Sequence, residues 1–324
     1  MSMTKKSKNN SKSKSKQTRK HRSKKQPICA PKIEKGKRNK SIKTHGTSCL
    51  MPYQLNLLKE RWNELYDDDD KQIITSTSAS GIWKSLNKRM KKQNNCLNEI
   101  CWLYSLLESY TAQDIASKQY RINAPELVSP KTKDESWLTN FHIDKFMKQY
   151  EEAYPNFKYL DTSPIDWDTK HSFSFDKCVS ESLCNIDLSD LYNNKGKSKL
   201  GIVFNTHPHT KGGEHWICMF IDLEKEFIVY FDSYGKREKV PKEVERFINK
   251  IVDESKFSLG IKLKIHKMQK RHQYGNGECG MYGLFTIVNL LKGREPDFFE
   301  KERISDTKMK ELRNKYFNNI KSVN

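Results

Sequence analysis

The stretch HQYGNGECGMYGLF, from His272 to Phe285, sets one cysteine in a glycine-rich loop directly before an apolar run. The run extends to about residue 292, which predicts a buried helix over 278–292 that Gly293 ends. Cys279 would then lie at the helix start, where the helix dipole favours the thiolate over the thiol. Because the thiolate is the reactive form of cysteine, the stretch predicts an activated sulfur nucleophile.

A base for this thiol is predicted on a β-hairpin upstream. The runs HWICMFID (215–222) and EFIVYFD (226–232) have the composition of strands and are joined by a short turn. In an antiparallel hairpin the start of one strand lies beside the end of its partner, so we expect His215 and Asp232 to meet. A histidine whose ring is oriented by a carboxylate is the base that a cysteine nucleophile needs.

The same loop offers donors for the oxyanion that forms when a thiolate attacks a carbonyl group. The backbone N–H of Cys279 and the side-chain amide of Gln273, six residues earlier, are the predicted donors. Gln269 lies ten residues before the cysteine and is assigned to the end of a strand instead. Three glycines would permit a tight approach of the backbone, and they are Gly275, Gly277 and Gly280.

Each of these residues also has a structural interpretation. A lone histidine on a strand is more often packing, and an aspartate before Ser-Tyr-Gly is more often turn chemistry. Cys218 lies on the same strand as His215 and is predicted on the opposite face, in the core. The remaining nearby histidines lack a strand-end acid at a suitable spacing, and they are His207, His209, His266 and His272. The residue types and their order therefore favour Cys279, His215 and Asp232 as a catalytic set.

Most of the formal net charge of +20 on the 324 residues lies at the N-terminus. Residues 1–45 hold 17 Lys and Arg side chains against one acid, Glu34. Such a Lys/Ser-rich segment cannot bury enough apolar surface to fold alone, which predicts a disordered basic tail. The tail is interpreted either as a solvated extension or as a segment that contacts DNA or RNA or signals nuclear import.

The eight cysteines form no C-x-x-C pair, so neither a zinc site nor a dense disulfide framework is predicted. Reduced thiols are favoured over disulfides, as in a cytosolic or nuclear environment. No apolar run approaches the ~20 residues that a membrane-spanning helix needs, and the N-terminus lacks the apolar region of a signal peptide. Secretion is therefore not expected.

Residues 46–125 are predicted to form a helical N-terminal module. Apolar residues recur at three- and four-residue steps over 55–65, and again over 82–90 after Ser80, which can cap a second helix. A third helix over 97–107 is apolar on most sides and is therefore expected to be buried. Asp67–Asp70 are assigned to a solvated turn, with a metal site as the less favoured alternative.

Residues 126–324 are predicted to form one α+β catalytic domain, because strand and helix patterns alternate along them. A helix capped by Ser136 is expected through 137–150, and another over 241–253. Besides the hairpin, two strands are expected, over 199–204 and 259–268.

These residues together resemble the adenain/Ulp1-like cysteine proteases. The resemblance covers roughly residues 136–292 and rests on His215–Trp216, Asp232, Gln273, the Glu-Cys-Gly triplet of 278–280 and the Trp137–Leu138 pair. It implies a papain-like α+β fold in circularly permuted order, with His before Asp before Cys. It also implies a role for each residue: general base for His215, orienting acid for Asp232, nucleophile for Cys279, oxyanion donor for Gln273, and substrate contact for Trp216 and Gly277.

The basic tail and the helical module are most similar to those of the large-DNA-virus members, as in African swine fever virus and the poxviruses. That resemblance implies cleavage of structural polyproteins at Gly-rich sites during virion maturation. The protein would then lie in the virion and in the viral factory of the host cytoplasm, or in the nucleus if the tail is an import signal. Two alternatives stay open: a protease of SUMO or ubiquitin-like proteins, and a nucleic-acid-binding virion protein with an inactive protease fold. The expected partner is a protein substrate, and the chemistry requires no cofactor or metal.

Overall fold

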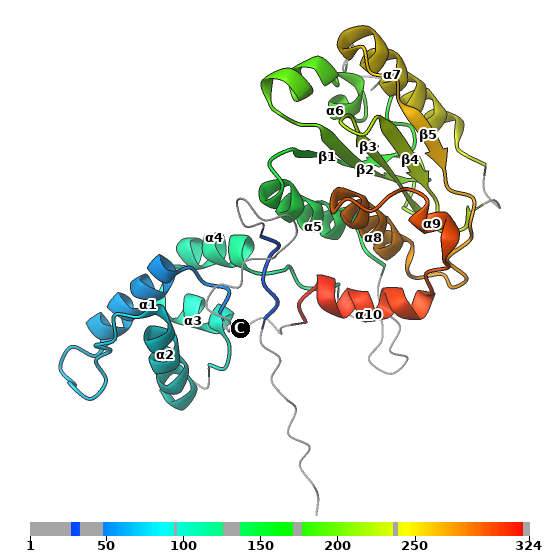
Figure 1. The fold of residues 1–324 in the computed structure, drawn as a ribbon. Helices are drawn as coiled ribbons and strands as arrows, with labels where there is room; N and C mark the ends of the chain where they lie inside the picture. The colour runs from blue at the N-terminus through cyan, green and yellow to red at the C-terminus, as the bar shows by residue number, and fades with distance from the viewer. Residues whose placement is uncertain are drawn as a thin grey trace, which may run out of the picture.

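The computed structural model of the chain describes residues 27–32, 48–93, 96–125, 137–170, 177–235 and 239–319. Figure 1 shows two parts, with helices α1–α4 on one side and a twisted sheet flanked by the other long helices on the other. Within these ranges no helix has the length and apolar character to cross a membrane. The same ranges contain no group of His, Cys, Asp and Glu side chains that could hold a metal ion, and Asp67–Asp70 are exposed.

The sheet has five strands in the spatial order β1-β2-β3-β4-β5. Their bounds are Phe157–Pro164 for β1, Lys199–Asn205 for β2, Trp216–Asp222 for β3, Phe227–Phe231 for β4 and Lys264–Lys267 for β5. β2, β3 and β4 are antiparallel neighbours, whereas β1 runs parallel to β2 and β5 parallel to β4. The predicted hairpin is confirmed, because β3 and β4 pair with Cys218 opposite Phe231.

β1 has no counterpart among the strands predicted from the sequence. Its register with β2 shifts between Tyr159 and Thr162, and Asp161 between them has a φ of 64°. Such a bulge interrupts the alternation of apolar and polar residues by which a strand is recognised. The segment FKYLDTSP therefore does not have the regular alternation by which a strand is predicted.

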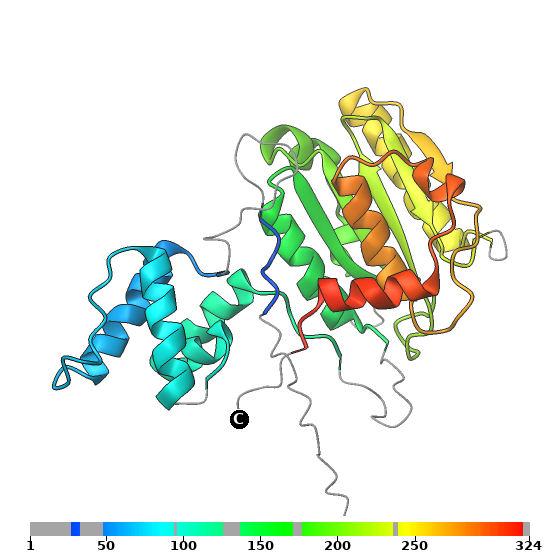
Figure 2. The same cartoon turned by 60° about the horizontal axis from the view of Figure 1, so that its bottom comes forward.

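Helices cover both faces of the sheet. One face packs against α5 (Asn140–Ala153), α8 (Cys279–Leu291) and α10 (Asp306–Tyr316), which lie together in Figure 2. The other face packs against α6 (Glu181–Cys184) and α7 (Lys242–Leu259). Both faces of β3 are therefore buried, with Cys218 and Phe220 on the α8 side and Met219 on the α7 side. Two short helical segments complete this part, the π-helix η1 (Asp190–Asn194) and α9 (Phe298–Lys301).

Helices α1 to α4 have a hydrophobic core of their own. Their bounds are Pro52–Leu65, Ala79–Gln93, Glu99–Leu106 and Ser109–Gln119. The predicted apolar faces of α1 and α2 meet in this core, but Leu65 is 62% exposed. α1 ends at Leu65, so this residue lies on the last turn of the helix, and it is not part of the module core. α4 was absent from the predicted elements.

Residues 27–32 fall inside the segment predicted as a disordered tail, but they are ordered against the module. The Ala30 N–H donates to the Gln119 carbonyl at 2.9 Å, and the Arg121 N–H donates to the Ile28 carbonyl at 2.8 Å. Asn318, near the C-terminus, accepts from the Ile28 N–H at 2.7 Å. The disordered-tail prediction is therefore wrong for 27–32, and residues 1–26 and 33–47 lie outside the described residues.

The prediction of reduced thiols is also wrong for six of the eight cysteines. Disulfides join Cys29 to Cys49, Cys96 to Cys101 and Cys178 to Cys184. The paired Cα atoms are 5.2, 5.6 and 6.4 Å apart, within the range that a disulfide needs. Two of the pairs are only five and six positions apart in the sequence, whereas Cys29 and Cys49 are brought together over a separation of 20.

Two predicted element boundaries differ from the structure. α5 begins at Asn140, after Trp137 and Leu138, and Ser136 lies outside the described residues. The strand expected over 259–268 is reduced to β5, because α7 runs to Leu259 and ends on Gly260, whose φ is 70°.

Candidate active site

Cys279 is the first residue of α8, as predicted, and its side chain is buried with the residue 3% exposed. Gly280 follows it, and a Cβ at this glycine would lie 3.1 Å from the Leu138 side chain. The helix start therefore packs closely on the segment before α5, and a larger residue at this position would require Leu138 to move by a few tenths of an ångström. At Gly275 and Gly277 an added Cβ would meet open space or only ordinary contact, so packing within the chain does not require glycine at these two positions.

His215 and Asp232 meet at the end of the β3–β4 hairpin. His215 directly precedes β3 and Asp232 directly follows β4, so the antiparallel pairing brings them together across 17 positions. The His215 Nε2 lies 2.8 Å from the Asp232 Oδ1, and both residues are buried. With Nε2 directed at the carboxylate, Nδ1 is the ring nitrogen left to face Cys279.

The surroundings of His215 favour its charged form. Burial of the ring opposes the imidazolium, but hydrogen bonds to Asp232 and to Cys279, together with their negative charge, raise the pKa of His215 to about 9. The ring is thus placed to accept the proton of the thiol and to hold it as an ion pair. An imidazolium beside a thiolate is the reactive pair of a cysteine nucleophile.

Gln273 is fully buried beside this pair, at 0% exposure, and the neighbouring turn fixes its amide. The Ser233 hydroxyl donates to Gln273 Oε1 at 2.6 Å, and Gln273 Nε2 donates to the Gly275 carbonyl at 2.7 Å. An amide nitrogen carries two hydrogens, so one N–H of Gln273 remains for a further acceptor. Ser233 was not singled out from the sequence, although it directly follows Asp232.

The rival residues lie where the sequence placed them. Cys218 is buried in the core between the sheet and α8, and this burial raises the pKa of its thiol. His272 is buried and bonds through both ring nitrogens, to the Phe299 carbonyl and the Ile304 N–H. His207 and His209 pair with the nearby acids Glu214 and Asp166. Gln269 is exposed and bonds to the Lys267 carbonyl at the end of β5.

A cavity of about 540 Å³ opens over the thiol. Its lining includes His215, Asp232 and Cys279, and it also includes Trp137, Tyr234 and Asn276, which the sequence did not assign to the site. Gln273 and Gly277 are not among the lining residues. Because the three added residues lie on separate loops, only the tertiary structure brings them to the cavity.

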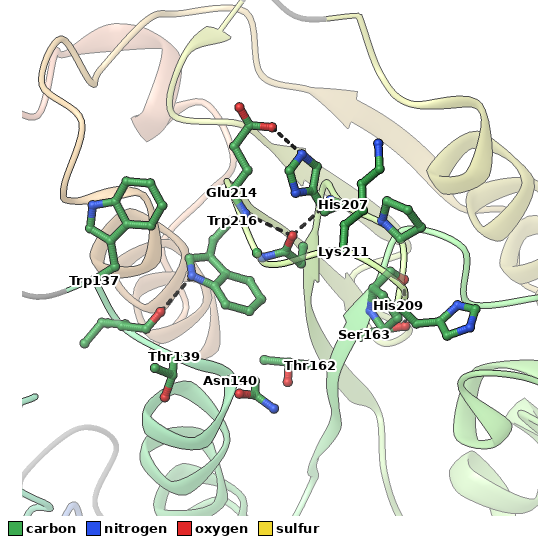
Figure 3. Close-up of a pocket in the computed structure, with 15 residues that line it drawn as sticks. Trp137, Thr139, Asn140, Thr162, Ser163, His207, His209, Lys211, Glu214 and Trp216 are labelled. Atoms are coloured by element: carbon green, nitrogen blue, oxygen red, sulfur yellow. Dashed lines mark hydrogen bonds and ion pairs between the residues drawn. The ribbon is translucent and has the colours of Figure 1, made fainter.

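A second cavity of about 430 Å³ adjoins the first and shares Trp137 and Glu214 with it. Trp216 lines this second cavity, and its indole N–H donates to the Leu138 carbonyl at 2.8 Å (Figure 3). The predicted substrate contact Trp216 is therefore held rigidly beside the cavity. The remaining wall comes from the start of α5, the end of β1 and the loop that carries His207 and Lys211.

Comparisons with known proteins agree with this geometry. Residues 197–324 match the family model described as the Ulp1 protease family, C-terminal catalytic domain. This part of the chain is similar to the catalytic domain of the Ulp1-type cysteine proteases. The match includes Cys279, His215 and Asp232, and the sequence-based resemblance to this family is confirmed.

The proteins to which the chain is similar include proteases of large DNA viruses. A thiol protease of Acanthamoeba polyphaga mimivirus is 30% identical over 192 residues, which cover 58% of this chain and 59% of that protein. The chain thus spans little more than half the length of the mimivirus relative. A cysteine protease of African swine fever virus is 27% identical over 270 residues, 75% of this chain and 91% of that protein. In other isolates of the same virus the corresponding protein is named a SUMO-1 cysteine protease.

A crystal structure of the African swine fever virus protease has the same fold. It aligns with a TM-score of 0.57 and 20% identity, covering 91% of this chain and 96% of that one. The alignment extends over the helical part as well as the protease sheet. The predicted α+β fold is thereby confirmed.

Proposed function

We propose that this Ulp1-type protease is a cysteine endopeptidase with Cys279 as nucleophile, His215 as general base and acid, and Asp232 as orienting acid. The observation that carries the proposal is the 2.8 Å contact of His215 with Asp232 in a cavity that also contains Cys279. His215 takes the thiol proton, and the thiolate attacks the peptide carbonyl carbon. The imidazolium then gives its proton to the leaving amine, and water hydrolyses the thioester.

The oxyanion of the tetrahedral intermediate would be stabilised by two N–H donors. One is the backbone N–H of Cys279 at the start of α8, where the helix dipole adds to the effect. The other is the free N–H of the Gln273 amide, whose orientation Ser233 sets from the opposite side. Gln273→Ala should therefore lower kcat/KM by about 10²–10³-fold, as removal of an oxyanion donor does in other hydrolases.

The substrate is proposed to be an extended segment of a viral structural polyprotein, cleaved after small Gly-rich sites during virion maturation. The segment would cross from the second cavity to the first, past Trp137 and Trp216. Two indoles beside the path leave little room for side chains next to the scissile bond, which favours glycine there. The named relatives in mimivirus and African swine fever virus support a large-DNA-virus setting, and with it a location in the virion and the viral factory.

The alternative substrate is a SUMO or ubiquitin-like protein, because African swine fever virus relatives are named SUMO-1 cysteine proteases. The two candidates are separated by incubating the full chain with viral core polyproteins and with SUMO and ubiquitin precursors. A mass-spectrometric map of new termini identifies the products. Cleavage of the ubiquitin-like precursors alone would contradict the polyprotein assignment.

Cys279→Ala tests the nucleophile and the third possibility, an inactive fold that binds nucleic acid. We expect it to abolish hydrolysis and labelling by a thiol alkylator while the fold persists. Cys218→Ala is the matched control, since it removes the other free thiol from the core and should keep hydrolysis per folded molecule. Hydrolysis by the Cys279→Ala protein would overturn the assignment, and absence of hydrolysis in the wild type would favour the inactive fold.

The basic N-terminal segment is proposed to bind DNA or RNA, or to act as a nuclear import signal. The structure sharpens the test, because Cys29 is bonded to Cys49 and must be retained. Deleting residues 1–26 should spare hydrolysis of a short peptide and weaken nucleic-acid binding, with a smaller dependence of the affinity on salt. Binding at low salt that the deletion leaves unchanged would refute this role.

A further inference from the structure

We infer that Tyr234 is a positioning residue of the proposed active site, which holds His215 in place and stabilises its charged form through a stacked ring. This inference rests on the proposed function and adds a residue that no part of the sequence pattern assigned. Tyr234 lies two residues after Asp232, in the turn that follows β4. It also lines the cavity above Cys279.

Tyr234 contacts both members of the His–Asp pair. Its ring lies nearly parallel to the His215 ring, with 4.6 Å between centroids and 19° between planes. Its backbone N–H donates to Asp232 Oδ1 at 2.9 Å, the same oxygen that bonds the His215 ring. One residue therefore fixes the carboxylate and covers a face of the imidazole.

The turn that carries Tyr234 cannot shift easily, because it is clamped to the loop before α8. The Ser233 carbonyl accepts from the N–H groups of His272 and Gln273, each at 2.9 Å. Gly235 has a φ of 65°, and a Cβ there would lie 2.6 Å from the Arg271 backbone nitrogen. These contacts thus fix the position of the Tyr234 ring relative to the His215 ring.

A cation–π chain continues outward from this ring. The Arg271 guanidinium lies 5.8 Å from the Tyr234 ring centroid and 4.2 Å from the Tyr274 centroid. Arg303 lies 4.2 Å from the Tyr274 centroid. Aromatic faces attract cations, so the ring of Tyr234 can stabilise the imidazolium of His215, which stacks on it. Arg271, in the loop before α8, contacts the Tyr234 ring as well and helps to hold that ring in position.

The stack acts on a particular step of the proposed reaction. When the thiol proton moves to His215, the ring becomes a cation, and the face of Tyr234 attracts that cation more than the neutral ring. The side chain of Tyr234 is itself neutral, because burial raises the pKa of its hydroxyl. The charged and titratable groups around His215 and Tyr234 are Asp232, Cys279, Glu214, Lys239, Arg271 and Asp306.

The test compares Tyr234→Leu, which removes the aromatic face, with Tyr234→Phe, which keeps it. In the full chain, the pH at which kcat/KM falls on the alkaline side should drop by about half a pH unit in Tyr234→Leu. Tyr234→Phe should leave that pH in place. The pH at which kcat/KM rises on the acidic side should be unchanged in both variants. That rise reports loss of the thiol proton while His215 is still charged. Loosening of the fold would lower kcat/KM at every pH and would move neither of these two pH values.

A second readout does not depend on hydrolysis. In a ¹⁵N NMR titration of the Cys279→Ala protein, the additional change Tyr234→Leu should lower the titration midpoint of His215 by the same amount. Tyr274→Leu is the matched control, since it removes the neighbouring ring of the chain without touching His215. An unchanged His215 titration in Tyr234→Leu, or an equal drop in Tyr234→Phe, would overturn the inference. Failure of the wild type to hydrolyse any peptide would instead count against the proposed function.

Discussion

The helical module and the protease sheet each bury a carboxylate, and the two are held in different ways. Glu99 in the module is 1% exposed and accepts from the Cys49 N–H at 3.1 Å, the Trp83 indole at 2.5 Å and the Tyr120 hydroxyl at 2.8 Å. Asp232 in the sheet is 3% exposed and accepts from the titratable ring of His215.

The difference between the two sites lies in their donors. Burial, together with the charge and hydrogen bond of Glu99, raises the pKa of Tyr120 well above its usual value, so this donor keeps its proton. The Glu99 site therefore stabilises the module and takes part in no proton transfer. His215 can gain and lose a proton in the accessible pH range, so the same degree of burial at Asp232 supports chemistry.

The largest expected effect is that of Asp232→Ala on catalysis, and it tests whether Asp232 does more than accept a structural hydrogen bond, as Glu99 does. We expect kcat/KM to fall by about 10²–10⁴-fold, because the imidazole loses its orienting acid and the imidazolium its counter-charge. Steady-state hydrolysis of a peptide cleaved by the wild type provides the measurement. A loss of less than about threefold would mean that the carboxylate is only a structural acceptor, as Glu99 is.

Glu99→Ala should have the opposite signature. Two buried donors and the partly buried Trp83 indole would lose their acceptor, so we expect the free energy of unfolding of the module to fall by about 3 kcal/mol. Denaturant unfolding followed by tryptophan fluorescence measures this change, since Trp62 and Trp102 lie in the module core. The kcat/KM of the folded protein should change by less than about twofold. A large loss of activity at full stability would show that the module contributes to catalysis.

The Cys29–Cys49 disulfide should stabilise the module by a similar amount. It closes a loop with a sequence separation of 20, for which the loss of chain entropy predicts about 3 kcal/mol. The double variant Cys29→Ser/Cys49→Ser should therefore lower the midpoint of module unfolding and keep peptide hydrolysis. Equal unfolding midpoints for this variant and the wild type would show that the contacts of residues 27–32 suffice without the bond.

The dependence of kcat/KM on pH should be set by the His215–Asp232 pair and not by the Glu99 site. As the pH rises through about 9, His215 loses the proton that it must give to the leaving amine, and kcat/KM should fall tenfold per pH unit beyond that point. The pH profile of the Glu99→Ala protein should coincide with that of the wild type. A displaced profile would indicate coupling between the module and the active site.

Much of the site could be predicted because its parts follow regular local patterns. The apolar run after Cys279 is long enough to identify a buried helix and its start. The two apolar strands before Asp232 are joined by a turn short enough to leave only antiparallel pairing. The first fact placed Cys279 at a helix start and the second placed His215 beside Asp232, without knowledge of the rest of the fold.

The parts that escaped prediction depend on contacts between distant segments. β1 is bulged at Asp161 and so lacks the alternation of a regular strand. The Cys29–Cys49 disulfide and the docking of residues 27–32 depend on where the chain returns to the module. Trp137 and Tyr234 belong to the cavity only because loops from separate elements converge there.

The sequence by itself therefore predicted where Cys279, His215 and Asp232 lie in their elements, because helix starts and hairpin ends are set by interactions between near neighbours in the chain. The tertiary structure alone decided what surrounds them: the indoles beside the cavity, the ring stacked on His215 and the serine that orients Gln273. These contacts join residues up to 78 positions apart, as in the bond from Trp216 to Leu138. Only the packing of the whole domain can place such residues, since no local pattern encodes a contact over that distance.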